Sequence, residues 1–473
     1  MCKKKTKVIN LNVRRNILMI YLGLFVFLCS CSKNIDNKVY TTAISQIDMN
    51  ANGHIEQLHA FDSAYTLCYK NRDDTYSLYI FTSPIQYKNN TSYCLIDNTI
   101  VKSKKEGFIF ENKANTVKTY FPKVLSDSFL IEDDNGYMEF KLNWNVSGFS
   151  EVKHTIYTNM YGNMVDAVIY EHKDMNIVFY STKAGIKTEI VLKERPISNV
   201  LSFTIKTNTI FYENKQDGYI LFKKEGKNKS IIYQPLVQYM TANRQQLDIT
   251  TQLDINREGD DYHVAMIIDK DVLSNISIEH PVRLDTSFEM YLHKMADTSV
   301  YSKKNDNNYL ANYAIIGEHS EFGEGWHYVR SRFRYFSRSL KPSNVISSFY
   351  CIYDLSNDEK DASVTLYELN TQWSSTNLIW SERVEPGNEI SKSEFHEGMI
   401  QFNITEFTKE CLKDPELGKE SRGFVMKSNK EKTVVTSDNS VMVPFFRIDM
   451  KKLPKDFIEN KYINPPIISS DNV

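Results

Sequence analysis

The feature that most constrains the fold is a series of short runs of aromatic and β-branched residues, separated by tight-turn signals. The clearest runs are Tyr76–Phe81, Thr155–Tyr157, Ala167–Tyr170, Ile177–Tyr180 and Leu201–Ile205. Turn formers stand between the runs, at 134–136, 161–163, 216–218 and 258–261. Strands joined by Asn-Gly or Asp-Gly are typical of hairpins, and strands spaced by about 8–12 residues are typical of sandwiches and barrels. The sequence therefore predicts an all-β fold of antiparallel β-sandwich lobes.

Helical patterning is limited to one short segment. It runs from Thr405 to Leu412, with Thr405 in position to cap it. Apolar residues make up 41% of the chain and aromatic residues 12%, which is enough to bury a core and excludes a disordered chain. With only 17 Gly and 12 Pro, the chain is not of the collagen-like or Pro/Gly-rich class either.

The first thirty residues have the features of an export signal. They contain six Lys and Arg residues and no acidic residue, and the apolar stretch Ile17–Leu28 is shorter than the roughly 20 residues that span a bilayer. Leu28-Cys29-Ser30-Cys31 resembles the bacterial lipobox, which implies cleavage after Ser30 and a lipid on Cys31. The alternative is a short anchor that is not cleaved. Both readings export the rest of the chain, and the first places it at the cell surface, held in the membrane by lipid and facing outside the cytoplasm.

Removing this signal changes the charge and the cysteine inventory. Six basic residues and no acidic ones leave, so the formal charge falls from −2 to −8. An acidic chain is a poor ligand for a phosphate backbone, so we expect no nucleic-acid partner. Cys68, Cys94, Cys351 and Cys411 are scattered without metal-ligand spacing. We expect no metal site and no cofactor, and burial of these thiols; a Cys68–Cys94 disulfide stays open.

The C-terminal part, residues 288–450, carries seven segments that resemble the strands of one family in order. They are Met295–Tyr301, Val329–Phe336, Val345–Tyr353, Val364–Trp373 with Leu378–Trp380, Gln401–Phe407, Arg422–Ser428 and Pro444–Ile448. Together they resemble the DNRLRE domain, also classed as carbohydrate-binding module family 96. The resemblance implies a jelly-roll-like β-sandwich that binds polysaccharide. One acidic residue of the family pattern is missing, because Phe336 and Ser337 stand in its place.

Residues 95–286 resemble a second kind of segment. Glu111–Pro122, Lys187–Leu192, Gln234–Val237 and His280–Asp285 are similar to landmarks that precede DNRLRE domains in Rhs-type and wall-associated secreted bacterial proteins. This resemblance implies a β-rich exported module rather than an active site.

These observations give an expected domain order. Residues 1–30 are the signal, 31–45 a tether, 46–286 the β-rich region, 287–450 the DNRLRE-like sandwich and 451–473 a flexible tail. A further division of the β-rich region near residue 148 is left open.

Two sets of residues are candidate ligand contacts. Arg330, Arg332 and Arg334 alternate along an expected strand, so they would share one face and could bind the carboxylates of an acidic sugar. An ordinary polar outer face is the alternative. Trp326 lies in a glycine-containing expected loop and is the candidate for an exposed stacking platform, whereas Trp373 and Trp380 are expected in the core.

One further cluster is a candidate calcium site. Asn305–Asn308 could supply oxygen ligands together with Asp297, but Lys303 and Lys304 would repel a cation, so a plain turn is favoured.

The leading functional hypothesis is a non-catalytic exported surface lipoprotein whose C-terminal sandwich binds a polysaccharide or cell-wall glycan, acidic or neutral. The alternative is a structural or adhesin-type scaffold that contacts protein partners and has no glycan site. A hydrolase with an unrecognised carboxylate pair is a third hypothesis, although the zincin, nucleophile-elbow and phosphate-loop motifs are absent from the sequence.

Overall fold

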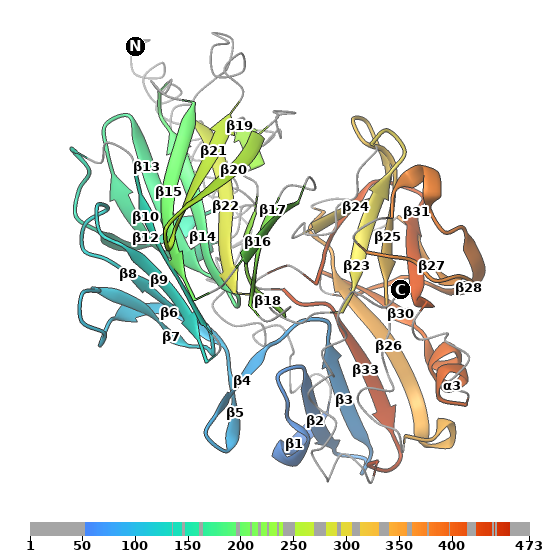
Figure 1. Cartoon of the computed structure of the whole chain (residues 1–473). Helices are drawn as coiled ribbons and strands as arrows, with labels where there is room; N and C mark the ends of the chain where they lie inside the picture. Colours follow the sequence, from blue (N-terminus) through green and yellow to red (C-terminus); the bar gives the residue numbers. More distant parts are fainter. Residues whose placement is uncertain are drawn as a thin grey trace, which may run out of the picture. The chain divides into compact units, whose positions relative to one another are not determined.

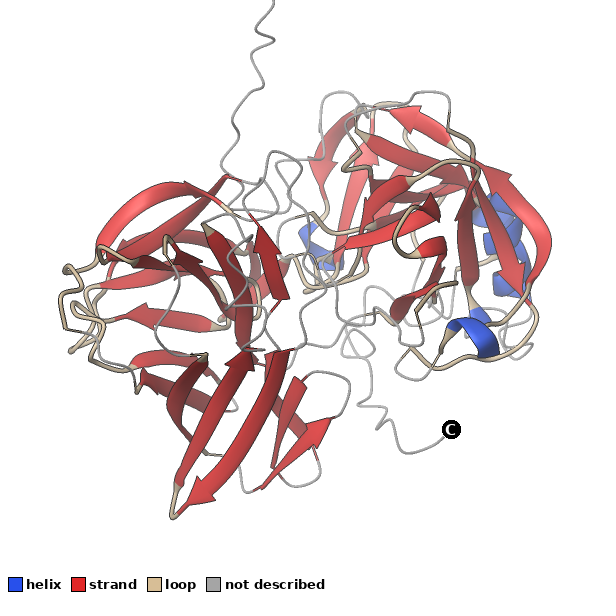
Figure 2. Cartoon of the chain, turned by 90° about the horizontal axis from the view of Figure 1, so that it is seen from above, coloured by secondary structure: helices blue, strands red, loops and turns tan. Residues whose placement is uncertain are grey.

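The computed structural model describes residues 53–454 with several gaps. The gaps are 135, 144–146, 160–163, 195–198, 209–210, 216–218, 225–226, 234–235, 240–250, 269–280, 291–294, 305–312, 331–339, 357–361, 376–377, 397, 414–421, 438 and 440–441. The expected signal, Cys31, the tether and most of the expected tail therefore lie outside the described residues. Within the described part, strands dominate and antiparallel pairing joins them into two β-sandwiches, so the predicted all-β class is confirmed (Figure 2).

The first sandwich is built from residues 97–290 (Figure 1). One of its sheets has the strand order β20-β21-β15-β10-β9-β8-β7-β6. Its strands are β6 (Asp97–Lys102), β7 (Phe110–Ala114), β8 (Lys118–Phe121), β9 (Phe129–Asp133), β10 (Gly136–Leu142), β15 (Val200–Thr207), β20 (Thr251–Glu258) and β21 (Asp261–Ile268).

The facing sheet has the order β11-β12-β13-β14-β22-β18-β17-β16, and β19 also pairs with β22. Its strands are β11 (Lys153–Thr158), β12 (Met164–Glu171), β13 (Met175–Ser181), β14 (Gly185–Leu192), β16 (Phe211–Lys215), β17 (Tyr219–Lys224), β18 (Lys227–Tyr233), β19 (Leu236–Tyr239) and β22 (Val282–Met290).

Aromatic side chains from both sheets fill the core of this sandwich. The rings of Phe129 and Phe179 lie 4.3 Å apart, and those of Phe140 and Phe288 lie 4.2 Å apart and stacked. β10 pairs with β15 across residue 148, and one hydrophobic core spans both sheets. The division near residue 148, which the sequence left open, is therefore wrong: strands on either side of that position belong to one sheet.

The second sandwich combines strands from both ends of the chain. One sheet has the order β1-β2-β3-β33-β26-β30-β29. Its strands are β1 (His54–Gln57), β2 (Thr66–Asn71), β3 (Tyr76–Phe81), β26 (Val345–Tyr353), β29 (Glu394–His396), β30 (Met399–Asn403) and β33 (Phe445–Met450). In Figure 1 the blue strands β1–β3 lie beside the red strand β33.

The other sheet has the order β28-β27-β31-β25-β24-β32, and β23 pairs with β25. Its strands are β23 (Asp297–Tyr301), β24 (Tyr313–His319), β25 (Gly323–Val329), β27 (Val364–Leu369), β28 (Pro386–Lys392), β31 (Phe424–Ser428) and β32 (Lys432–Val435). The rings of Tyr350 and Phe446 pack against Phe424 across the two sheets, at 5.0 Å and 6.1 Å.

This arrangement corrects the expected domain order at the N-terminal end of the described residues. Residues 54–81 were expected to fold with the region that follows them, but β3 pairs with β33 from Tyr76 opposite Met450 to Phe81 opposite Phe445. The first sandwich is therefore an insertion between β3 and β23. Its two ends meet, because the backbone N–H of Met295 donates to the carbonyl of Thr82 at 2.8 Å. Residue alternation shows which face of a strand is buried, but it does not show which strand lies alongside.

The remaining short elements agree closely with expectation. The five strands named from their composition all form, and the predicted helix is α3 (Thr405–Lys413). Asn403, two residues before the expected cap, accepts a hydrogen bond through its Oδ1 from the N–H of Thr405 at 3.1 Å. β4 (Gln86–Asn89) and β5 (Ser92–Leu95) form a separate hairpin, and Cys68 and Cys94 are free thiols.

No helix among the described residues is both long enough and apolar enough to cross a membrane.

Candidate functional site

Three of the four tryptophans gather on the outer face of one sheet in the C-terminal sandwich. Successive side chains of a strand point to opposite faces. On β25, Val329 therefore faces the main core, whereas Trp326 and Tyr328 face outward. The chain after β27 folds back over this face and places Trp373 and Trp380 against them. We call Trp326, Tyr328, Trp373 and Trp380 the tryptophan cluster.

The rings of the cluster contact one another in pairs. Trp326 meets Trp380 edge-on at 5.1 Å, and Tyr328 meets Trp373 at 5.6 Å. Their polar atoms are also bonded: Trp326 Nε1 donates to Glu324 Oε1 at 2.8 Å, and Trp373 Nε1 donates to the carbonyl of Arg422 at 2.6 Å. Because buried indole and phenol groups need such partners, the cluster is a satisfied small core rather than an open platform.

Cationic side chains lie over the tryptophan faces. Arg383 lies 4.9 Å from the ring centroid of Trp326 and 4.3 Å from that of Trp380, and Lys427 lies 4.0 Å from Trp326. Arg330 covers Trp373 at 5.0 Å. Each such contact contributes about 0.5–1 kcal/mol at an exposed site and more when desolvated. A sugar that stacked on these faces would have to displace the protein's own cations.

The structure corrects the expected role of Trp326. Its side chain is 3% exposed and lies in the middle of β25, not in a loop. The glycine that suggested a loop is required by crowding: a Cβ on Gly325 would lie 2.3 Å from the carbonyl oxygen of Ile315 on β24. Trp326 is therefore not an exposed stacking residue.

The expected arginine stripe is described only at its first member. Arg330 follows the last residue of β25, and its Nη2 donates to the carbonyl of Trp373. The Arg330 side chain therefore contacts the segment after β27 that carries Trp373 and covers this sheet. Arg332 and Arg334 lie outside the described residues, so their shared face stays a prediction.

Trp373 is 5% exposed, which confirms its expected core position, but Trp380 is only half-buried. It begins the 3₁₀ turn η5 (Trp380–Glu382), and Arg383 Nη1 donates to its carbonyl at 2.9 Å. Sequence reasoning missed Arg383 and Lys427. The spacing Trp380-Ser-Glu-Arg383 was a usable signal for the first, because one tight turn returns residue i+3 to residue i.

A serine, a histidine and an aspartate meet inside the sandwich. Ser299 Oγ lies 2.9 Å from His327 Nδ1, and His327 Nε2 lies 3.7 Å from Asp297 Oδ2. Ser299 and His327 are fully buried between the sheets, where a substrate has no access to the hydroxyl. We therefore interpret this group as a structural polar network, joined by the Ser299–His327 hydrogen bond and the His327–Asp297 contact.

This network also bears on the expected calcium ligand. Asp297 is 4% exposed, and its carboxylate accepts hydrogen bonds from the backbone N–H and hydroxyl of Ser437 at 2.7 Å and 2.5 Å. It is therefore engaged inside the sandwich, while Asn305–Asn308 lie outside the described residues. Across the described part of the chain, no group of three or more His, Cys, Asp or Glu residues is arranged to hold a metal.

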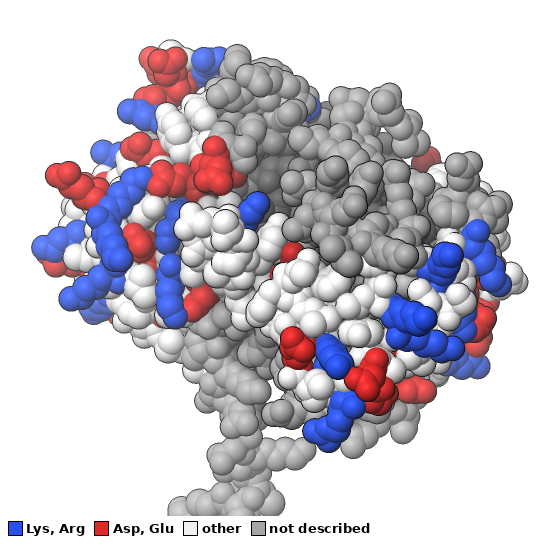
Figure 3. Space-filling model, turned by 90° about the horizontal axis from the view of Figure 1, so that it is seen from below, with Lys and Arg blue, Asp and Glu red and all other residues white. Residues whose placement is uncertain are grey.

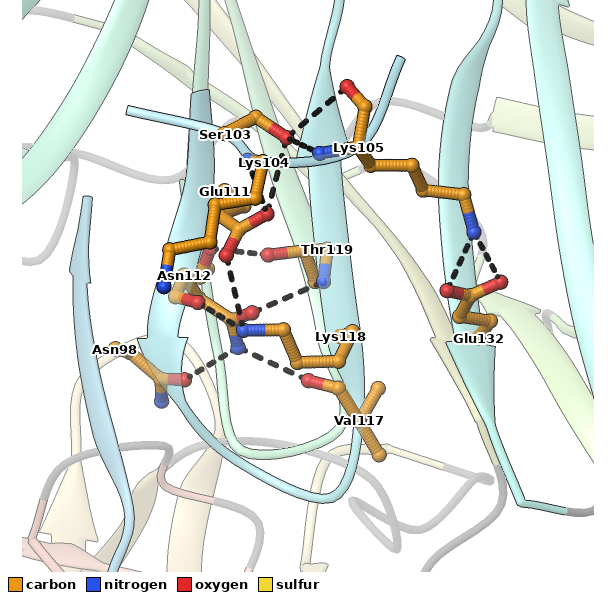
Figure 4. A network of polar contacts seen from close by, with 11 residues as sticks. Asn98, Ser103, Lys104, Lys105, Glu111, Asn112, Val117, Lys118, Thr119 and Glu132 are labelled. Carbon is orange, nitrogen blue, oxygen red and sulfur yellow. Dashed lines mark hydrogen bonds and ion pairs between the residues drawn. The ribbon is translucent and has the colours of Figure 1, made fainter. Parts of the chain in front are cut away.

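A second polar network lies on the outer face of the first sandwich (Figure 4). Lys105 Nζ contacts both oxygens of Glu132, at 2.6 Å and 2.7 Å. Glu111 accepts from Ser103 Oγ at 3.0 Å and lies 3.7 Å from Lys118 Nζ. Burial lowers the pKa of Lys118, and the nearby Glu111 opposes this effect. The network pairs opposite charges across β7, β8 and β9, as a stable outer sheet face requires.

The surface charge is mixed as well. On the face shown in Figure 3, basic and acidic side chains of the described residues are interspersed. An acidic polysaccharide on this face would therefore meet both signs of charge.

Comparison with known proteins finds only weak structural likenesses to this chain. No protein-family model and no curated protein matches the chain. A Parabacteroides distasonis protein described as secreted is 10% identical and covers 80% of this chain and 100% of its own, with a TM-score of 0.15. The N-terminal domain of a Streptococcus gordonii adhesin is 9% identical and covers 74% and 93%, with a TM-score of 0.13. TM-scores this low do not establish a shared fold. The strand pairing within this chain is what shows the all-β class.

Proposed function

We propose that this chain is an exported, non-catalytic surface protein, anchored by a lipid on Cys31, whose β-sandwiches form a scaffold that contacts protein partners outside the cell. The observation that carries the proposal is the state of the tryptophan cluster. Arg383, Lys427 and Arg330 lie over its rings, so its stacking faces are used within the fold. The lipobox-like residues 28–31 support export and anchoring.

Polysaccharide binding is the second candidate function, and the half-buried indole of Trp380 favours it. Arg383 and Glu385 form an ion pair of 2.7 Å beside this ring, with side chains 26% and 65% exposed. An aromatic ring flanked by paired charges could hold one sugar unit. The resemblance of residues 288–450 to the DNRLRE domain supports this candidate from the sequence.

The anchor is tested on the full-length chain in a bacterial host. We expect the wild-type protein in the membrane fraction and Cys31→Ser in an unlipidated form that metabolic labelling with a fatty acid does not mark. Cys29→Ser, two residues away, is the matched control and should still be labelled. Equal labelling of wild type and Cys31→Ser would contradict the anchor at Cys31.

Glycan binding is tested by affinity electrophoresis of the exported chain in gels that contain neutral or acidic polysaccharides. If the chain is a scaffold without a glycan site, the polysaccharides should not slow its migration. Retardation that Trp380→Ala abolishes and Tyr137→Ala retains would overturn it in favour of a glycan site at Trp380. Tyr137 is a suitable control because it is an exposed aromatic residue, 39% accessible, on the other sandwich.

A further inference from the structure

A buried lysine and a buried aspartate join the two sheets of the C-terminal sandwich. Lys432 is the first residue of β32, and Asp354 directly follows β26 in the opposite sheet. Lys432 Nζ lies 2.9 Å from Asp354 Oδ2, and the two side chains are 2% and 9% exposed. By comparison, the pair Lys105–Glu132 has the same chemistry, but its side chains are 37% and 32% exposed.

The backbone holds both partners in place. The N–H of Asp354 donates to the carbonyl of Gly398 at 2.9 Å, and the N–H of Leu355 donates to the carbonyl of Thr433 at 2.8 Å. Asp354 also forms an isolated bridge with Val434. Folding therefore holds the amine 2.9 Å from an oxygen of the carboxyl group, which removes the entropic cost of bringing two reactants together.

The surroundings of the pair are apolar on one side. Lys432 Nζ lies 5.4 Å from the ring centroid of Phe395, and Val434, two residues along β32, is fully buried. Such an interior excludes bulk water, which would otherwise compete with the amine for the carboxyl carbon. Only an amine that has given up a proton can attack a carboxyl carbon, so amide formation begins with a proton transfer within the pair.

We propose that Lys432 and Asp354 condense into an intramolecular amide that links the two sheets covalently. A proton passes from the Lys432 ammonium to Asp354 Oδ2, and the freed Nζ attacks Cγ. Ser356 donates its backbone N–H to Asp354 Oδ1 at 2.9 Å, which stabilises the charge that grows there. The Nζ–Cγ bond forms, the Cγ–Oδ2 bond breaks, and Oδ2 leaves as water with two protons from Nζ. The step releases one water molecule and needs no other reagent.

The amide would give a surface protein a cross-link that reduction does not break. It closes the chain between Asp354 and Lys432 and ties β26 to β32, so these sheets could not separate while it is intact. Cys68, Cys351 and Cys411 are buried free thiols, so this link would do the work that a disulfide does in other exported proteins. The inference does not depend on the proposed scaffold function.

Mass spectrometry of the exported full-length chain tests the proposal. The chain is denatured and digested with trypsin, so that the lipid does not enter the measured mass. We expect a branched peptide that contains Asp354 and Lys432, lighter by one water molecule than its two linear parts, with no cleavage after Lys432. Recovery of the two linear peptides alone, with cleavage after Lys432, would overturn the proposal and leave an ordinary buried ion pair.

Two variants locate the link. Lys432→Arg keeps the positive charge but has no nucleophilic amine, so only linear peptides are expected from it. Lys105→Arg changes the half-buried pair with Glu132 on the other sandwich and should leave the branched peptide unchanged. If Lys432→Arg fails to fold, the wild-type digest still decides the question, because it needs no variant.

Discussion

At the scale of single residues, His54 shows how an N-terminal side chain is fixed in the C-terminal sandwich. Its ring stacks on Tyr69 at 4.7 Å, and its Nε2 lies 2.8 Å from the hydroxyl of Tyr79. Nδ1 lies 2.5 Å from Asn71 Oδ1, so the network assigns Nδ1 as the donor and Nε2 as the acceptor. Burial lowers the pKa of His54; Arg447 also lowers it, while the hydrogen bond to Asn71 and the charge of Asp449 oppose the shift.

This environment makes the stability of the protein sensitive to acid. The unfolded chain binds a proton on His54 near its ordinary pKa of 6.5, whereas the folded chain binds it only at lower pH. The stabilisation is therefore present above about pH 6.5 and is lost as pH falls toward the folded pKa. We expect His54→Gln to reduce the drop in melting temperature between about pH 8 and about pH 5.

Thermal unfolding at the two pH values measures this effect. His263→Gln is the control, because His263 is 40% exposed and lies in the other sandwich. An equal drop in the wild type and in both variants would show that His54 does not contribute to the acid sensitivity.

At the scale of elements, runs of aromatic and β-branched residues predict the strands well where turn formers separate these runs in the sequence. β3 begins and ends at the expected residues, Tyr76 and Phe81. The segment Glu321–His327, which contains most of β25, is expected as a loop because it contains Gly323 and Gly325. The structure shows that Gly325 serves a close approach of two strands, which is a tertiary requirement that a single sequence does not reveal.

The two faces of β10 give a test of the strand assignment. Phe140 is fully buried and stacks on Phe288, whereas Tyr137 on the same strand is 39% exposed. Removing a buried phenylalanine costs about 3–5 kcal/mol through lost transfer energy and the cavity left behind. We therefore expect Phe140→Ala to lower the free energy of unfolding by this amount, and Tyr137→Ala to change it by less than about 1 kcal/mol.

Denaturant-induced unfolding measures both values. Similar losses in the two variants would contradict the assignment of the β10 faces.

At the scale of the whole molecule, the chain is one sandwich with another inserted into it. β3 pairs with β33, and Thr82 and Met295 meet where the inserted sandwich begins and ends. A segment whose ends meet can be removed with little strain on the remainder. A fragment of residues 288–450 lacks β3, which is one of the two strands that pair with β33.

Excision tests this topology. A chain in which a short Gly/Ser linker replaces residues 84–293 should fold and unfold cooperatively, because all strands of the second sandwich remain. Residues 288–450 alone should show no cooperative transition. The topology would be wrong if the shorter fragment unfolded as cooperatively as the excised chain, measured by circular dichroism in denaturant.

The sequence by itself determined the all-β class, the positions of five strands and the short helix, because these follow from composition and turn signals within a few residues. Tertiary structure decided which strands lie side by side. Ser77 Oγ donates to Asp449 Oδ1 at 2.7 Å across 372 residues, a contact that no local pattern specifies. It also decided that Trp326 is covered by Arg383 and Lys427, and that Lys432 meets Asp354. These positions depend on how distant segments exclude water and pack together, and alternation along one strand carries no information about the partner strand.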